Sequence, residues 1–298
     1  MYIFLSVLTG VTLAVMVSLN GNLTAQYGVF PAAAIIHAVG SIAAVILCAF
    51  QKEKRKILGH KPLWIYLGGA IGVSTTVFQN IAYGNISMTG LIALGLLGQT
   101  ATSLLIDAFG LFGMKRNRFR PESVPGLLLS LAGILIMFDS CEAATAVAAI
   151  ISFAAGITVV LSRTFNAKLA EKTGALRSSM VAHLLGLPIT VFIALLTTKG
   201  NIAEGAYAMP FRPWSYLGGV MGVCVILLCN LAVPKVSAYR LTILTFIGQI
   251  FTGVLLDLSL GNKYDSVSFW GGLVIAAGSA LSYLLEYRAT RKAECEKQ

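Results

Sequence analysis

Charged residues are scarce in this sequence: Asp, Glu, Lys and Arg make up only 11% of its 298 residues. A soluble domain of this length needs many more polar side chains to cover its surface. Hydrophobic residues account for 57% of the chain, and most of them fall in apolar windows of about 20 residues. The lack of charge therefore excludes a soluble globular protein and indicates an all-α, polytopic integral membrane protein.

Two further absences concern chemistry. The five cysteines have neither a metal-binding nor a disulfide spacing, and we expect them to act as small apolar filler. The predicted helices carry no cluster of paired His and Asp residues at one interface, as a membrane enzyme would need. We therefore expect no enzymatic activity, no metal site and no cofactor. The cysteines are Cys48, Cys141, Cys224, Cys229 and Cys295.

Hydropathy predicts ten membrane-spanning helices, five in each half of the chain. The longest predicted loops, 51–62 and 198–213, leave no room for a soluble domain. The predicted spans are 3–25, 31–50, 63–83, 89–111 and 124–138 in the first half, and 145–167, 178–197, 214–233, 238–258 and 268–287 in the second.

Positive charge is distributed unevenly over the loops between these spans. Of the 22 Lys and Arg residues, 18 fall in loops or termini on one predicted side, and only Lys199, Arg212 and Lys263 fall on the other. The positive-inside rule then places both termini in the cytoplasm of a cell with an inner membrane. The net charge of +10 is explained by anionic membrane lipid, so no nucleic-acid partner is expected.

The two halves of the chain, 1–140 and 141–298, repeat each other. Because each half has five predicted spans, an odd number, the halves must insert in opposite directions, as in alternating-access transporters. The sequence thus predicts two inverted five-helix repeats. Asn20, Gly28, His37 and Gly40 recur as Asn166, Gly174, His183 and Gly186, 146 positions later; Trp64, Gly68, Gly69, Gly72, Asn80, Gln99 and Asp107 recur as Trp214, Gly218, Gly219, Gly222, Asn230, Gln249 and Asp257, 150 positions later.

The most distinctive repeated stretch is 91–107, LIALGLLGQTATSLLID, which recurs as LTILTFIGQIFTGVLLD at 241–257. Gln99 and Gln249 lie about 15 Å into their spans, close to the middle of the membrane. An amide at this depth needs a polar partner inside the protein. We expect both glutamines to bind substrate across the repeat axis; the alternative is a hydrogen bond that only joins helices. The glycines around them predict close helix packing or sliding surfaces.

The pattern Trp-x-Tyr-Leu-Gly-Gly-x-x-Gly, followed by Gly-Gln and then Leu-x-Asp, resembles the YdcZ-like branch of the drug/metabolite transporter superfamily. The resemblance covers nearly the whole chain, which is similar to two five-span members fused together. It implies a ten-helix fold with a central cavity between two four-helix cores. The fifth span of each half would then be peripheral.

Polar residues at matching depth predict a cluster on each side of the membrane. His37 lies six residues after Pro31, about 9 Å below the predicted outer boundary, with Asn20 and Asn80 near the outer ends of their spans. Inversion places Asn166, His183 and Asn230 on the inner side. These clusters would act as paired gates, or as a polar belt that fixes the helix hairpins. A buried His, with an ordinary pKa of ~6.5, is also a candidate proton carrier.

Three charged residues in the spans need an explanation. Arg163 has no repeat counterpart; it either extends to the cytoplasmic interface or recruits an anionic substrate group. Asp107 and Asp257 end their helices, where the helix dipole disfavours a carboxylate, so each must pair with donors, for Asp107 the loop of Lys115 and Arg116. No Asp or Glu lies at mid-depth, in contrast to the central carboxylate of the related small multidrug antiporters.

Together these features predict a secondary transporter of a small organic metabolite, working by alternating access with its site at the midplane. The missing carboxylate favours neutral, zwitterionic or weakly anionic substrates. A lipid or headgroup flippase on the same fold is one alternative, and a small-cation drug exporter is a less favoured one. The expected partners are the substrate and membrane lipid, and a homodimer is left open.

Overall fold

Ten α-helices make up the described part of the chain, and it contains no β-strand. This computed structural model describes residues 1–51, 56–57, 62–83, 85–86, 88–117, 121–138, 143–200, 212–260 and 266–295. The helices are α1 (Tyr2–Tyr27), α2 (Val29–Ala49), α3 (Leu67–Ala82), α4 (Met88–Phe109), α5 (Val124–Phe138), α6 (Ala143–Thr173), α7 (Ala175–Thr197), α8 (Gly218–Ala232), α9 (Ala238–Leu260) and α10 (Ser266–Cys295).

Each of the ten predicted spans coincides with one of these helices, and among the described residues seven helical segments are long and apolar enough to cross a membrane. They are α1, α2, α4, α6, α7 and α9, and also α8 when the preceding 3-10 helix Pro213–Leu217 is counted with it. Helices α3 and α5 have only 16 and 15 residues, fewer than the ~20 that a bilayer requires. The ten-span arrangement therefore stays a prediction, and the predicted boundary between the halves at 140/141 falls outside the described residues.

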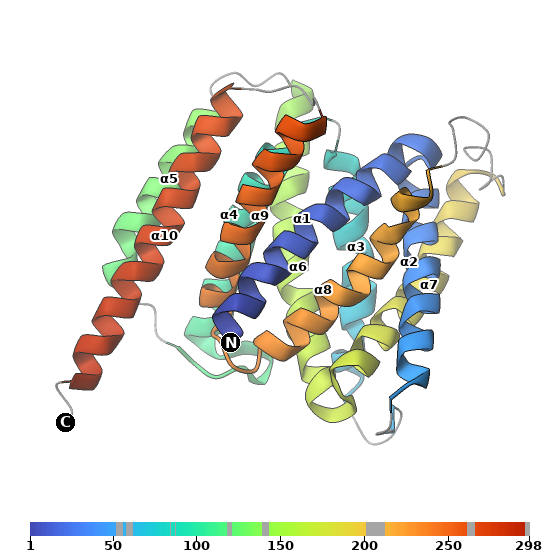
Figure 1. Cartoon of the computed structure of the whole chain (residues 1–298), viewed down its shortest axis with the longest axis horizontal. Coiled ribbons are helices and arrows are strands. Elements are labelled where there is room, and N and C mark those ends of the chain that lie inside the picture. Colours follow the sequence, from blue (N-terminus) through green and yellow to red (C-terminus); the bar gives the residue numbers. More distant parts are fainter. Residues whose placement is uncertain are drawn as a thin grey trace.

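The helices form a core of eight with a pair at its edge (Figure 1). Helices α5 and α10 lie side by side at that edge and pack mainly on each other. In the core, α1 packs against α9 and α8, and α4 against α6 and α9. Helix α2 packs against α7, and α3 against α6. This places α5 and α10 at the periphery, as the family resemblance implies.

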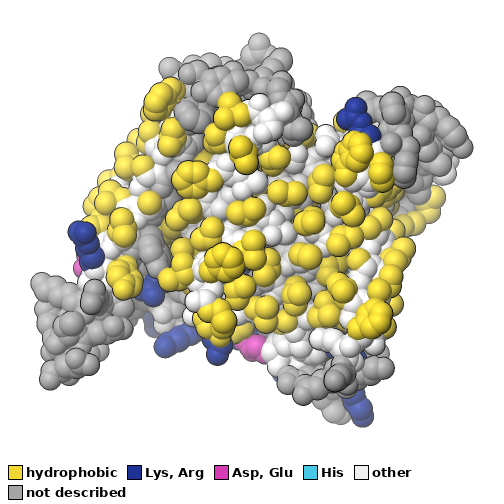
Figure 2. All heavy atoms as spheres, in the orientation of Figure 1, with side chains coloured by type: hydrophobic (Ala, Val, Ile, Leu, Met, Phe, Trp, Pro, Cys, Tyr) yellow, Lys and Arg dark blue, Asp and Glu magenta, His cyan; other side chains and the backbone are white. Residues whose placement is uncertain are grey.

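The outer surface of the bundle is apolar. Figure 2 shows hydrophobic side chains over the whole middle of the visible face, whereas Lys and Arg lie along its margins. Phe4, Ile42, Phe192 and Phe251 are each more than half exposed. Such a continuous apolar surface would be a liability in water, and in a bilayer it faces acyl chains.

Glycine allows the helices to approach at matching places in the two halves. A Cβ on Gly98 of α4 would lie 2.0 Å from the carbonyl oxygen of Phe153 in α6, and one on Gly248 of α9 would lie 2.2 Å from that of Val7 in α1. These two crossings are related by the repeat. The packing interpretation of the glycines is confirmed at both positions, since any side chain there would collide with backbone.

Two aspartates fasten the ends of α4 and α9 to each other. Asp107, near the end of α4, accepts the backbone N–H groups of Ala238 (3.1 Å) and Tyr239 (2.8 Å) at the start of α9. Asp257, near the end of α9, accepts the N–H (3.0 Å) and the hydroxyl (2.7 Å) of Thr89 at the start of α4. Each carboxylate thus satisfies donors that a helix N-terminus leaves unpaired, and α4 and α9 run antiparallel.

The prediction that both aspartates pair with donors is therefore confirmed, but the predicted partner of Asp107 was wrong. Arg116 donates to the carbonyl of Ala108 instead (2.8 Å). The negative charge at the end of one helix is stabilised by the positive end of the neighbouring helix, so a basic loop is not required.

Candidate functional site

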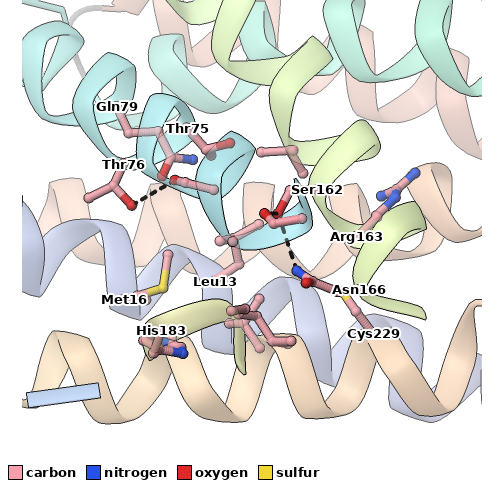
Figure 3. Close-up of a pocket in the computed structure, with 18 of the residues that line it drawn as sticks. Leu13, Met16, Thr75, Thr76, Gln79, Ser162, Arg163, Asn166, His183 and Cys229 are labelled. Carbon is pink, nitrogen blue, oxygen red and sulfur yellow. Dashed lines mark hydrogen bonds between the residues drawn. The ribbon is translucent and has the colours of Figure 1, made fainter. Parts of the chain in front are cut away.

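A cavity of about 110 Å³ lies in the eight-helix core. Its walls come from α1–α4 and α6–α9, and no residue of α5 or α10 lines it. A single water needs about 10–15 Å³ of such volume, so the cavity has room for several waters or a small solute. Figure 3 shows how side chains from α1, α3, α6, α7 and α8 converge on it.

The cavity wall combines apolar surface with polar side chains, and none of the described residues that line it is acidic. Hydroxyl and amide groups come from α1, α3, α4, α6 and α9, and the ionisable groups are Arg163, His37, His183 and the thiol of Cys229. The polar lining residues besides these four are Thr9, Asn20, Thr75, Thr76, Gln79, Gln99, Ser162, Asn166 and Thr245. This composition suits hydrogen bonding to a neutral or anionic solute better than binding of a cation.

The two histidines meet at the centre of this wall. The ring centroids of His37 in α2 and His183 in α7 are 5.8 Å apart, and both rings are buried. The prediction of one separate cluster on each side of the membrane is therefore wrong for the histidines. Helix α2 begins at Val29, so His37 is its ninth residue of 21, close to the middle of the helix rather than to its outer end.

The four asparagines divide into two kinds. Asn20 and Asn166 line the cavity, and each directs its Oδ1 at a repeat-related glycine, Gly218 and Gly68. Within the described chain the Asn20 Oδ1 accepts no hydrogen bond, although Asn20 is only 3% exposed.

Asn80 and Asn230 lie outside the cavity wall. Their Nδ2 atoms donate to the carbonyls of Val29 (3.4 Å) and Ala175 (2.9 Å), at the starts of α2 and α7. These contacts match the alternative of a polar belt that fixes neighbouring helices.

The two central glutamines are both buried, at 4% exposure each, so neither faces lipid. Gln99 lines the cavity, whereas Gln249 is not among the lining residues. The Nε2 of Gln249 makes no hydrogen bond to any described residue. The two halves therefore differ at this position in spite of the repeat.

Arg163 is buried at 6% exposure, and the prediction that it extends to the membrane interface is wrong. Its Nη2 donates to the Ser103 hydroxyl (3.1 Å), to the Ala238 carbonyl (3.1 Å) and to the Thr242 hydroxyl. Helix α6 continues to Thr173, so Arg163 lies about 15 Å before the helix end. Asp107 accepts the N–H of the same Ala238, so its carboxylate and the guanidinium contact the same residue at the start of α9.

Sequence reasoning missed the hydroxyl groups that position Arg163. Ser103 and Thr242 are hydrogen-bonded to each other (2.7 Å) and join α4 to α9 under the guanidinium. They do not recur in the repeat, which was the signal used to select candidates. The available signal was that Arg163, Ser103 and Thr242 all lack a counterpart of the same residue type in the other half of the chain.

A bundle of long apolar helices around an internal cavity defines the class of the protein: it is a multi-pass membrane protein. The particular family follows from a match over residues 1–136 and 147–281 to the family described as "Putative inner membrane exporter, YdcZ". The chain belongs to this family, which confirms the resemblance at the level of the family, while its fused ten-span form stays a prediction. It is an inner-membrane exporter family, a class that is typically not enzymatic.

The same fold occurs among solved structures. Twenty-five chains match; one, described only as "Crystal structure of protein", superposes with a TM-score of 0.60 over 95% of this chain and 98% of that chain, at 15% identity. Comparison with curated proteins gives no match.

Proposed function

We propose that this protein carries a small neutral, zwitterionic or weakly anionic metabolite across the inner membrane, and that the central cavity is its binding site. The observation that carries the proposal is a cavity between eight helices whose described lining residues include hydroxyl and amide side chains, an arginine and two histidines but no carboxylate. A cationic solute would find no acidic partner among the lining residues, whereas a solute with acceptor groups finds hydroxyl and amide donors here.

The proposed mechanism is alternating access between two inverted five-helix repeats, which together make ten spans. The antiparallel pair of α4 and α9, with its reciprocal aspartate contacts, supports an inverted relation. In Figure 1 the chain ascends through α1 and descends through α6, and the N-terminus and the end of α10 lie toward the same lower side. The positive loops would place that side in the cytoplasm.

A contact at one end of the bundle supports the existence of a closed gate there. The hydroxyls of Tyr27, at the end of α1, and Tyr216, before α8, are 2.5 Å apart and link the two halves. The repeat counterpart of Tyr216 is Tyr66, whose hydroxyl donates to Ile57 of its own half (2.6 Å). In the proposed cycle this tyrosine link opens when the opposite end closes, and Asn20 and Asn166 move with their helices.

Within the site, we propose that the Gln99 side chain contacts the solute directly. The Nε and Nη1 groups of Arg163 would supply further hydrogen-bond donors to the solute. The test is a thermal-shift screen of the purified protein against small metabolites, repeated with Gln99→Ala. Loss of one buried hydrogen bond should weaken binding of a hit about tenfold, and its thermal shift should fall accordingly.

Gln249→Ala is the matched control, because Gln249 is equally buried at the repeat-related position but does not line the cavity. A hit should keep its full thermal shift in this variant. A hit that binds the Gln99→Ala protein with unchanged affinity would remove Gln99 from the site. Uptake of each hit into proteoliposomes then distinguishes a transported substrate from a ligand that only binds.

A further inference from the structure

The hydrogen bonds of His37 and His183 determine which ring nitrogen carries the proton. The Nδ1 of His37 lies 2.9 Å from the carbonyl oxygen of Ala33, and the Nδ1 of His183 lies 3.0 Å from that of Ser179. A carbonyl oxygen only accepts, so both Nδ1 atoms are donors. In a neutral imidazole the other nitrogen is then an acceptor. Both rings therefore present a bare Nε2.

Both Nε2 atoms lie in the interface between α2 and α7. A Cβ on Gly186 of α7 would be 2.6 Å from the His37 Nε2, and a Cβ on Gly40 of α2 would be 2.7 Å from the His183 Nε2. Each ring thus fills the space left by a glycine of the opposite helix, beside the cavity. Neither Nε2 makes a hydrogen bond to a described residue, so each ring presents an acceptor without a protein donor in the interface between α2 and α7.

The surroundings of the pair offer no other group that can take up charge. Among the cavity-lining residues, α1, α3, α4 and α9 contribute no ionisable side chain, α6 contributes Arg163, and α8 contributes the Cys229 thiol. Arg163 donates to Ser103, to Thr242 and to the carbonyl of Ala238. The remaining ionisable groups on the two helices themselves are Cys48 and Arg177, which interact with each other. No carboxylate lines the cavity.

We propose that His37 and His183 form a single site for one proton and that this proton is the coupling ion of the transporter. The inference rests on the proposed function for its role in transport, but not for the existence of the site. Hydronium gives its proton to an Nε2 lone pair, an N–H bond forms, and water is released. The second Nε2 or a cavity water accepts from the new N–H, so the charge is shared.

A second proton is opposed by the first. At 5.8 Å between ring centroids and an effective dielectric constant of about 20, repulsion lowers the affinity for the second proton on the order of a hundredfold. The pair therefore takes up one proton well before a second, and its two rings titrate as a coupled unit. A single histidine at this place would lack the second acceptor.

The test is an NMR titration of ¹⁵N-histidine-labelled protein in lipid nanodiscs. The background is His60→Gln, so that His37 and His183 are the only histidines. At alkaline pH both rings should show a protonated Nδ1 and an unprotonated Nε2. As the pH falls, the ¹⁵N signals of each ring should move through about half of the shift that full protonation produces. The two rings together then take up one proton.

The matched variant is His37→Asn, whose amide can donate to the Ala33 carbonyl from the position of Nδ1 but lacks an Nε2. In this variant the ¹⁵N signals of His183 should move through the full shift of protonation. His183→Asn is the reciprocal variant. Full and independent titration of both wild-type rings would overturn the shared site, and so would the absence of any change down to the pH of unfolding.

The outcome is distinguishable from that of the proposed function. If one shared proton is found but no solute is ever bound or transported, the proton site stands and the transporter proposal fails. If solutes bind in the cavity but the rings take up no shared proton, the transporter proposal stands and the coupling by His37 and His183 is wrong.

Discussion

Replacing Gly98 by alanine is expected to destabilise the protein by about 2–3 kcal/mol, one of the two largest effects that we predict for a single substitution. The added Cβ would lie 2.0 Å from the carbonyl oxygen and 3.0 Å from the carbonyl carbon of Phe153, and 3.1 Å from the amide nitrogen of Ile157. All three are backbone atoms, so the collision is relieved only if α4 and α6 move apart. Such movement also displaces the neighbouring Gln99 in the cavity wall.

The measurement is the midpoint of thermal unfolding in detergent, and Gly95→Ala is the control. Gly95 is also in α4, one turn earlier, but a Cβ there would have its nearest neighbour at 3.5 Å, an ordinary contact. Alanine is a better helix former than glycine by up to about 1 kcal/mol, so Gly95→Ala should be neutral or slightly stabilising. Equal losses in both variants would show that glycine is needed for backbone conformation and not for the helix crossing.

Much of the fold was predictable because apolar length and the repeat are properties of the chain itself. The span 124–138 coincides with α5, and the repeated pair Gly28 and Gly174 marks both helix–helix turns, with φ of 83° and 94°. Left-handed φ values favour glycine, so two glycines 146 positions apart were a reliable signal. Helix α3 was predicted too long, because its first turn, Leu63–Tyr66, is a 3-10 helix.

The candidate site was less predictable, because it depends on which helices cross and at what height. Counting residues from Pro31 gave the depth of His37 along one helix but not its distance from His183 in another. The end of α6 was predicted six residues early, at 167 instead of Thr173, and this error alone placed Arg163 near the interface. Hydropathy does not detect such an extension, since the last turns of α6 are polar.

Asp107→Asn is expected to cost about 3 kcal/mol, whereas Asp257→Asn, at the repeat-related position, should cost about 1 kcal/mol or less. Asp107 uses both carboxylate oxygens, one for the N–H of Ala238 and the other for that of Tyr239. An asparagine has only one acceptor oxygen, so one buried N–H at the start of α9 loses its partner. The substitution also removes the negative charge near Arg163.

Asp257 uses one oxygen for both of its contacts. Its Oδ2 accepts the N–H and the hydroxyl of Thr89, whereas its Oδ1 has no hydrogen-bond partner in the described structure. The oxygen of an asparagine amide can accept both bonds, and its NH₂ group then takes the place of the unpaired Oδ1. Only the charge at the start of α4 is lost, and a charge at a helix N-terminus contributes about 0.3–1 kcal/mol.

Thermal unfolding of both variants in the same detergent measures this difference, and the double variant Arg163→Met/Asp107→Asn separates its two causes. If the unbalanced arginine contributes, removing it together with Asp107 should recover part of the stability that Asp107→Asn loses. If the unpaired N–H is the whole cause, the double variant is no more stable than the single one. Equal destabilisation by Asp107→Asn and Asp257→Asn would mean that α4 and α9 require negative charge at their starts rather than a set number of acceptor atoms.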